Sequence, residues 1–151
     1  MNPNADRWFI SSLTKHFSDV CIANSLKFKS EDVATDVSRW TEWVELFING
    51  PSFNQLNTTD YLVRLDLDLL ITLKPGAANF FRIHDIAGIL AANMSPINIM
   101  KYGDGDSLLA CLPLSPAAGV GIRKIYYGVD PETKFKRVSM IGSYETITSL
   151  T

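Results

Sequence analysis

The sequence has few cysteines and no long apolar run. Cys21 and Cys111 lie 90 residues apart in apolar stretches, so we expect two buried free thiols rather than a disulfide bond. No run approaches the roughly 20 apolar residues of a membrane-spanning helix. Residues 1–8 lack the basic and apolar regions of a signal peptide. We therefore expect a protein that is made and kept in a cytosol and has no membrane partner.

Positive charge is not in excess either. Lys and Arg number 14 against 16 Asp and Glu, which leaves a net charge of -2. Lys134, Lys136 and Arg137 form a small basic group, which suits a soluble strand edge or an acidic partner surface. Binding to nucleic acid requires many clustered basic residues that neutralise phosphates. The composition therefore argues against DNA binding as the main task.

The motifs of common enzymes and cofactor sites are missing. His84-Asp85 has no nucleophile motif to act with, and His16 is no better placed. Residues 103–106 lack the further oxygen ligands of a calcium loop and predict a turn. Residues 119–121 lack the third glycine and the following helix of a dinucleotide-binding loop. We expect no catalytic residues, no metal and no cofactor.

What the sequence does have is the composition of one packed domain. Hydrophobic residues make up 46% of the 151 residues and charged residues 20%, as in globular proteins. No repeat or linker divides the chain, so a single domain over residues 1–151 is expected. Near its start, Phe9, Leu13, Phe17 and Val20 recur at helical spacing. They predict an amphipathic helix over residues 3–24 that lies on a sheet.

Residues 61–73 carry the clearest pattern in the chain. Apolar side chains occupy every second position, opposite the polar Arg64, Asp66 and Asp68, so a strand with one buried face is predicted. Its length would be about 43 Å. Because a typical strand has only ~5–6 residues, we expect this one to reach toward a neighbouring molecule.

Asp66 and Asp68 are the most suggestive polar pair. Paired carboxylates can bind a divalent cation or transfer protons. Alternate residues of a strand lie about 7 Å apart, however, and Arg64 offers a counter-ion. A solvated or inter-subunit sheet face is therefore the favoured interpretation of Arg64, Asp66 and Asp68.

The remaining elements complete an α+β fold. We expect a mainly antiparallel sheet with two helices packed on one face, because most strands adjoin one another in sequence. Trp40, Trp43, Tyr126 and Tyr127 suit interface anchors or core packing equally well. The remaining predictions are a loop over 29–41, a strand over 43–48, a turn over 49–52, a loop over 53–60, a helix that Asn79 caps and that runs to Met94, strands over 97–102, 108–114, 122–128 and 134–148, and a hairpin turn over 129–133.

Taken in order, these features resemble the tail-terminator, or tail-completion, proteins of tailed bacteriophages. The resemblance covers nearly the whole chain, and its motifs are turns and core positions. The residues that carry it are Asn2–Trp8, Asn49–Pro51, Tyr61–Leu73, Arg82–Ile86, Tyr102–Gly105 with Ser107–Leu109, and Gly142–Glu145.

The resemblance implies a virion protein made in the cytoplasm of a bacterial host. Its implied partners are further copies of itself in a ring, expected to be a hexamer, the tail-tube protein and the head–tail connector or stopper. DNA would pass through the lumen without sequence-specific contact, and no catalytic residue is carried over.

We hypothesise that Arg64, Asp66 and Asp68 face the lumen or a neighbouring subunit. Two alternatives remain open. One is a head–tail stopper or another neck or tube protein. The other is a small ligand-binding or enzymatic α+β domain that uses His84 or the two aspartates.

Overall fold

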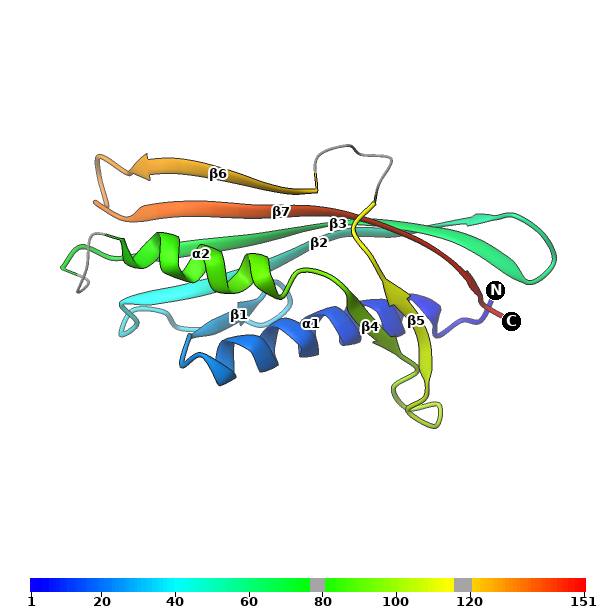
Figure 1. Ribbon diagram of the computed structural model, residues 1–151. Coiled ribbons are helices and arrows are strands. Elements are labelled where there is room, and N and C mark those ends of the chain that lie inside the picture. The colour runs from blue at the N-terminus through cyan, green and yellow to red at the C-terminus, as the bar shows by residue number, and fades with distance from the viewer. Residues whose placement is uncertain (77–80, 116–120) are drawn as a thin grey trace.

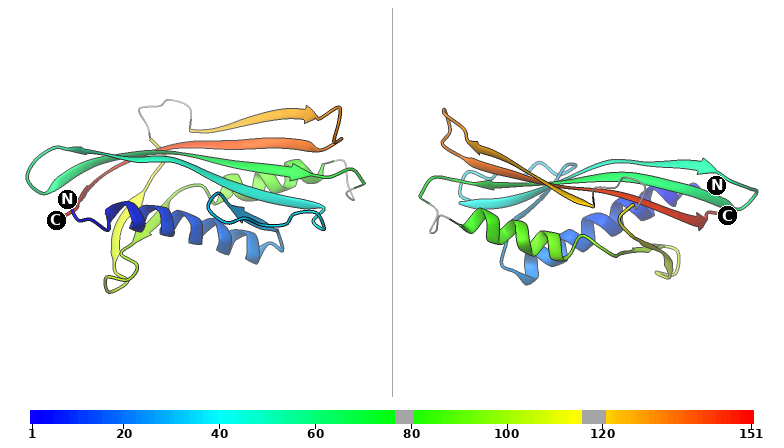
Figure 2. Two further views of the ribbon diagram at one scale, coloured as in Figure 1. Left: turned by 180° about the vertical axis from the view of Figure 1, so that it is seen from behind. Right: turned by 45° about the horizontal axis from the view of Figure 1, so that its top comes forward.

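The computed structural model describes residues 1–76, 81–115 and 121–151. Its main element is a five-stranded sheet in the order β1-β2-β3-β7-β6, and a separate pair of strands, β4 and β5, lies below it (Figure 1). The described helices, α1 and α2, lie on the same face of the sheet, which both views of Figure 2 show. The predicted α+β fold with a mainly antiparallel sheet and two helices on one face is confirmed.

Helix α1 (Ala5–Ala23) agrees closely with its prediction. Trp8, Phe9, Leu13 and Phe17 are buried against the sheet, as their spacing requires. The helix begins after Asn4, and Asn2 accepts a hydrogen bond from the Asn4 amide at 2.9 Å instead of capping the helix directly.

The long strand β3 (Asp60–Leu73) is the centre of the sheet rather than an arm. It pairs with β7 (Lys136–Ser149) along its entire length and with β2 (Glu42–Gln55) along most of it. Two partners of equal length satisfy its backbone groups within the chain, so the length of β3 does not by itself require a neighbouring molecule.

Strand β2 corrects two further predictions. Residues 49–52 form no chain reversal: the pairing register shifts between Asn49 and Ser52, and β2 continues to Gln55 through the predicted loop. The single extra residue of this bulge interrupts the ladder locally without ending it. The predicted loop over 29–41 also contains the end of a short strand, β1 (Phe28–Ser30), which pairs parallel with β2 over Val44–Leu46.

The later elements follow the sequence pattern. Strand β6 (Ile122–Val129) forms the expected hairpin with β7. Strands β4 (Ile97–Met100) and β5 (Leu108–Leu112) are joined by the turn predicted at 103–106. Helix α2 (Arg82–Ala92) buries Ile83, Ile86, Ala87 and Leu90. Asn79 and the first two residues of the predicted 119–121 loop lie outside the described residues.

The core lies between the sheet and the helices. Strand β3 contributes its apolar face, including Leu65, Leu67 and Leu69, and Tyr144 of β7 is also buried. The Tyr144 hydroxyl donates a hydrogen bond to the Met94 carbonyl. Within the described ranges, no helix is both long and apolar enough to cross a membrane.

The two cysteines differ in burial. Cys21 is fully buried on α1, and burial raises the pKa of its thiol from 9.0 to about 11. Cys111 is exposed, so the prediction of two buried thiols is wrong for this residue. It lies opposite Asn98 in the β4–β5 pair, on the face turned away from the buried Leu112 side. Both thiols are free.

Candidate assembly surface

The sheet face opposite the helices is the main candidate for function. We call it the open face, because both described helices lie on the other side (Figure 2). Cross-strand register decides which side chains share it, since directly paired residues point to the same side. By that register it includes Glu45, Phe47, Asn49, Ser52, Leu62, Arg64, Asp66, Asp68, Leu70, Arg123, Ile125, Tyr127, Arg137, Ser139, Ile141, Ser143, Glu145 and Ile147.

Arg64 is held across the sheet rather than along its own strand. Its Nε donates to a carboxylate oxygen of Glu145, the residue directly opposite on β7. The expectation that Arg64 is the counter-ion of the two aspartates is therefore not met. Opposite charges at paired positions form a favourable cross-strand contact. Sequence spacing could not find Glu145, which is 81 residues away.

Asp66 is exposed and lies between two polar neighbours. It faces Ser143 on β7 and Asn49 on β2. A hollow of about 520 Å³ opens at this place, next to the bulge of β2, and Arg64 and Glu145 also line it. The hollow therefore combines two carboxylates, one guanidinium and several hydroxyl and amide groups.

Asp68 lies in a different environment. Its Oδ1 is buried and has no hydrogen-bond partner among the described residues, and the same holds for Nε of Arg137. Both side chains line a second hollow, of about 450 Å³, whose walls include Tyr127 and Phe135. The structure thus divides the predicted set: Arg64 and Asp66 share one hollow, and Asp68 belongs to another.

Charge on the open face is nearly balanced. Its basic residues on the paired strands are Lys29, Arg64, Arg123 and Arg137, and its acidic residues are Glu45, Asp66, Asp68 and Glu145. A surface without net positive charge has no means of holding the phosphates of DNA tightly. The face can therefore lie beside nucleic acid without retaining it.

At one end of the open face, side chains pack against one another over the sheet. The Lys74 ammonium donates to the carbonyls of Val37 and Ser38 and lies 5.6 Å from the Trp43 ring and 5.9 Å from the Phe135 ring. Trp43 is consequently buried, so it serves the fold and is no exposed interface anchor.

The free edge of β6 is rich in exposed side chains. Tyr126 and Tyr127 are 50% and 57% exposed, and the neighbouring Val129 is 49% exposed. The Lys124 ammonium lies 2.7 Å from Nδ1 of His84, whose ring is 5.7 Å from that of Tyr126. We call Arg123, Lys124, Tyr126, Tyr127 and Val129 the β6 edge.

His84 is exposed on α2 and does not belong to the buried face of that helix. Its described neighbours are Lys124 and Tyr126. Neither of them offers the serine hydroxyl or cysteine thiol that a catalytic histidine would activate. Within residues 1–76, 81–115 and 121–151, no group of three or more His, Cys, Asp or Glu residues is placed to hold a metal ion.

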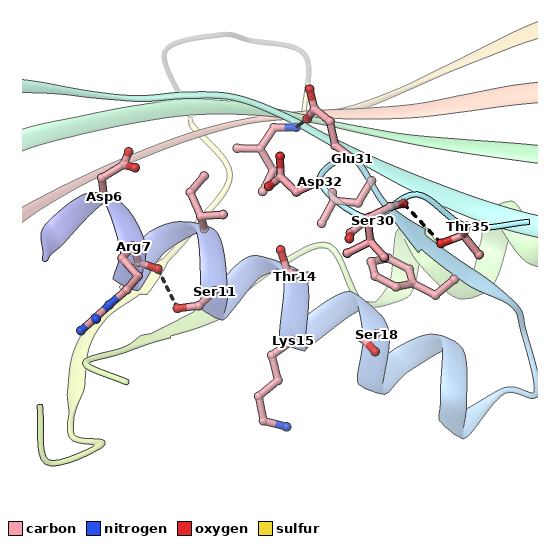
Figure 3. Close-up of a pocket in the computed structure, with 15 residues that line it drawn as sticks. Asp6, Arg7, Ser11, Thr14, Lys15, Ser18, Ser30, Glu31, Asp32 and Thr35 are labelled. Atoms are coloured by element: carbon pink, nitrogen blue, oxygen red, sulfur yellow. Dashed lines mark hydrogen bonds between the residues drawn. The ribbon is translucent and has the colours of Figure 1, made fainter. Parts of the chain in front are cut away.

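A third hollow could not be predicted from the sequence, because segments far apart in the chain form it. This α1 groove, of about 920 Å³, lies between α1 and the segment that follows β1 (Figure 3). Its apolar lining includes Ile10, Phe28 and Ile48, and the acidic lining is Asp6, Glu31 and Asp32.

Comparison with known proteins agrees with the fold. No protein-family model matches the chain, and no protein of curated function matches it in sequence. Twelve chains of solved structure match it. One of them, whose name states no activity, aligns with a TM-score of 0.59 over 97% of this chain and 96% of its own. At 11% identity, this likeness shows a shared fold alone.

Proposed function

We propose that this protein is a structural subunit of a virion, the tail-terminator ring of a tailed bacteriophage, and that it is no enzyme. The ring would be a hexamer that caps the tail tube and joins it to the head–tail connector or stopper. The subunit would be made in the bacterial cytoplasm and act in the assembled tail.

The observation that supports the proposal best is the open face. One side of a sheet with three 14-residue strands has no described helix over it. It carries the exposed Asp66, Asp68 with its buried Oδ1 that has no partner among the described residues, and apolar side chains such as Ile147, which is 63% exposed. Surfaces of this kind occur where a further subunit or an enclosed space completes the protein.

The charge of the open face suits a lumen. A channel that lets DNA pass must not bind its phosphates tightly, and a basic surface would do so. The near balance of charge on this face meets that requirement. Arg64, Asp66 and Asp68 then face the lumen or the adjacent subunit.

The mass of the purified protein in solution tests the proposal, measured alone and after addition of the tail-tube protein. We expect a hexamer, or a monomer that becomes one on contact with tube, and electron micrographs of tubes that stop growing. A protein that remains monomeric with and without tube would contradict a ring subunit.

A further inference from the structure

The two lateral edges of the sheet are chemically unlike. The β6 edge at one side is basic and aromatic, with Tyr126 and Tyr127 at least half exposed. Strand β6 pairs with β7 on one side only. Unpaired strand edges with exposed apolar side chains are sites at which another chain can add.

Charge is concentrated at the β6 end of the molecule. Residues 122–137 contain five Lys or Arg and two Asp or Glu, a net charge of +3. Because the whole chain carries -2, the rest of the molecule carries -5. The β6 end of one copy is therefore attracted to an accessible acidic site on the rest of another copy.

The α1 groove is such an acidic site, at the opposite edge of the sheet. Strand β1 pairs with β2 only over Val44–Leu46, and the groove lies where β1 ends. Here Glu31 reaches the edge of β2, with one carboxylate oxygen 3.4 Å from the Ile48 amide nitrogen. Apolar side chains line the groove, and carboxylates lie at its margin.

The basic residues of the groove are engaged elsewhere. Lys15 forms an ion pair with Asp19 at 2.7 Å and extends away from the β1 segment in Figure 3. Arg7 donates to the Tyr102 carbonyl at 3.3 Å. The three carboxylates of Asp6, Glu31 and Asp32 therefore outnumber the remaining positive charge of Arg7, and the groove is acidic. Val33 beside them is 56% exposed.

We infer that the β6 edge of one copy docks in the α1 groove of the next copy. Tyr126, Tyr127 and Val129 cover the apolar lining, and Arg123 and Lys124 lie against the acidic margin formed by Glu31 and Asp32. Both the charges and the apolar surfaces are complementary, as in specific interfaces.

This contact is head-to-tail, because it joins two different surfaces of the same chain. Such contacts form rings when the rotation between copies closes and filaments when it does not. The inference deepens the proposed ring function and rests on it, since it names the two surfaces that successive subunits would join.

A charge exchange tests the contact. We expect Asp32→Lys and Arg123→Glu each to raise the concentration at half-assembly about three- to tenfold, since each places like charges together. The double variant restores the opposite-charge pair and should assemble within about twofold of the unchanged protein. Additive loss in the double variant would overturn the inference.

The matched control is Asp104→Lys, which makes the same charge change at the β4–β5 turn. Asp104 is exposed, bonds Asn4, and lies in neither proposed surface. It should assemble as the unchanged protein does. Weakening equal to that of Asp32→Lys would show a general charge effect and would overturn the inference.

Cysteine cross-linking provides a second test in a Cys111→Ser background. Chains carrying both Asp32→Cys and Arg123→Cys should form a disulfide-linked ladder under mild oxidation. A mixture of the two single variants should stop at dimers. The pair Asp104→Cys with Arg123→Cys should give no ladder.

The outcomes separate the two proposals. A hexamer without the Asp32–Arg123 ladder would overturn this contact and leave the ring function standing. A protein that never assembles with tube present would overturn both. A ladder that extends beyond six copies without closing would support the contact and contradict the ring.

Discussion

At the scale of single residues, the buried hydroxyl of Tyr144 contributes most clearly to stability. It donates to the carbonyl of Met94, two residues beyond the end of α2, and so joins β7 to the segment that follows this helix. Burial raises the pKa of this hydroxyl well above its usual value of 10.0. The phenol therefore remains protonated, and able to donate, throughout the neutral range.

Tyr144→Phe should lower the free energy of unfolding by about 1–3 kcal/mol, because it leaves a buried carbonyl without its donor. Urea denaturation measures the change. The control is Tyr127→Phe, which removes a partly buried hydroxyl that donates to Ser139 at 3.3 Å on a side chain that is 57% exposed. It should cost less than about 1 kcal/mol. Equal effects in the two variants would contradict the assigned role of Tyr144.

The cysteines give a second residue-scale prediction. At pH 8, a thiol reagent should modify Cys111 rapidly and Cys21 only after unfolding, because Cys21 is fully buried and the thiolate is the reactive form. One reactive thiol per native chain, and two per unfolded chain, is the expected count. Rapid reaction of both thiols in the native protein would contradict the burial of Cys21.

The raised pKa of Cys21 also predicts an alkaline loss of stability. The unfolded thiol ionises near pH 9.0 and the folded one near 11, so the unfolded chain releases its proton first. Stability is unaffected below pH 9 and falls by up to about 2–3 kcal/mol as the pH rises through 11. A Cys21→Ala variant should lose this thiol's share of the alkaline slope, which begins about one pH unit below the share of Tyr144, because the unfolded thiol has the lower pKa.

At the scale of elements, the packing of β7 against the segments that follow α2 and β5 depends on Gly142. A Cβ added there would lie 3.0 Å from Met94 Cε and from Tyr144 Cε2, and 3.1 Å from Leu114 Cδ2. Three side chains would have to move at once. Strand β7 therefore requires the smallest residue at this position.

Gly142→Ala should lower the free energy of unfolding by about 1–3 kcal/mol through overpacking. Gly88→Ala is the matched control: it lies on α2 with no atom within 4 Å of the added methyl group. It should raise stability by about 0.5–1 kcal/mol, because alanine favours a helix. Thermal denaturation of both variants distinguishes packing from backbone entropy, and a neutral Gly142→Ala would contradict the tight contact.

At the scale of the whole molecule, the open face decides between a lumen and a subunit contact. Its paired strands carry equal numbers of acidic and basic residues on this face. Reversing both aspartates would make it strongly basic. If the open face lines the lumen, the added positive charge would hold DNA. If the face contacts a neighbouring subunit, the added charge would disturb the charge complementarity of that contact.

The double variant Asp66→Lys, Asp68→Lys should therefore have one of two effects. If the face lines the lumen, rings form and retain duplex DNA at low salt, and the affinity falls as salt rises. If the face meets a neighbour, the concentration at half-assembly rises. Filter binding and light scattering measure the two, and Glu132→Lys, at the exposed β6–β7 turn, is the control. Unchanged assembly and unchanged DNA retention would contradict both roles.

Periodicity in the sequence determined the first helix, predicted over residues 3–24 and observed over 5–23, and the long strand, predicted over 61–73 and observed over 60–73. Each of these elements buries one continuous face, and a local repeat reports burial of that kind directly. The α+β fold with both helices on one face followed from their order. The candidate residues Arg64, Asp66 and Asp68 followed from the polar side of the same repeat.

Only the tertiary structure decided what surrounds these residues. The partner of Arg64, the bulge within β2, the exposure of His84 and Cys111, and the α1 groove all depend on contacts between segments far apart in the chain. Short strands such as β1 carry too few residues for a repeat and are stabilised by pairing with β2. The burial of a side chain is set by its neighbours in space, and a local pattern records only which face of its own element it occupies.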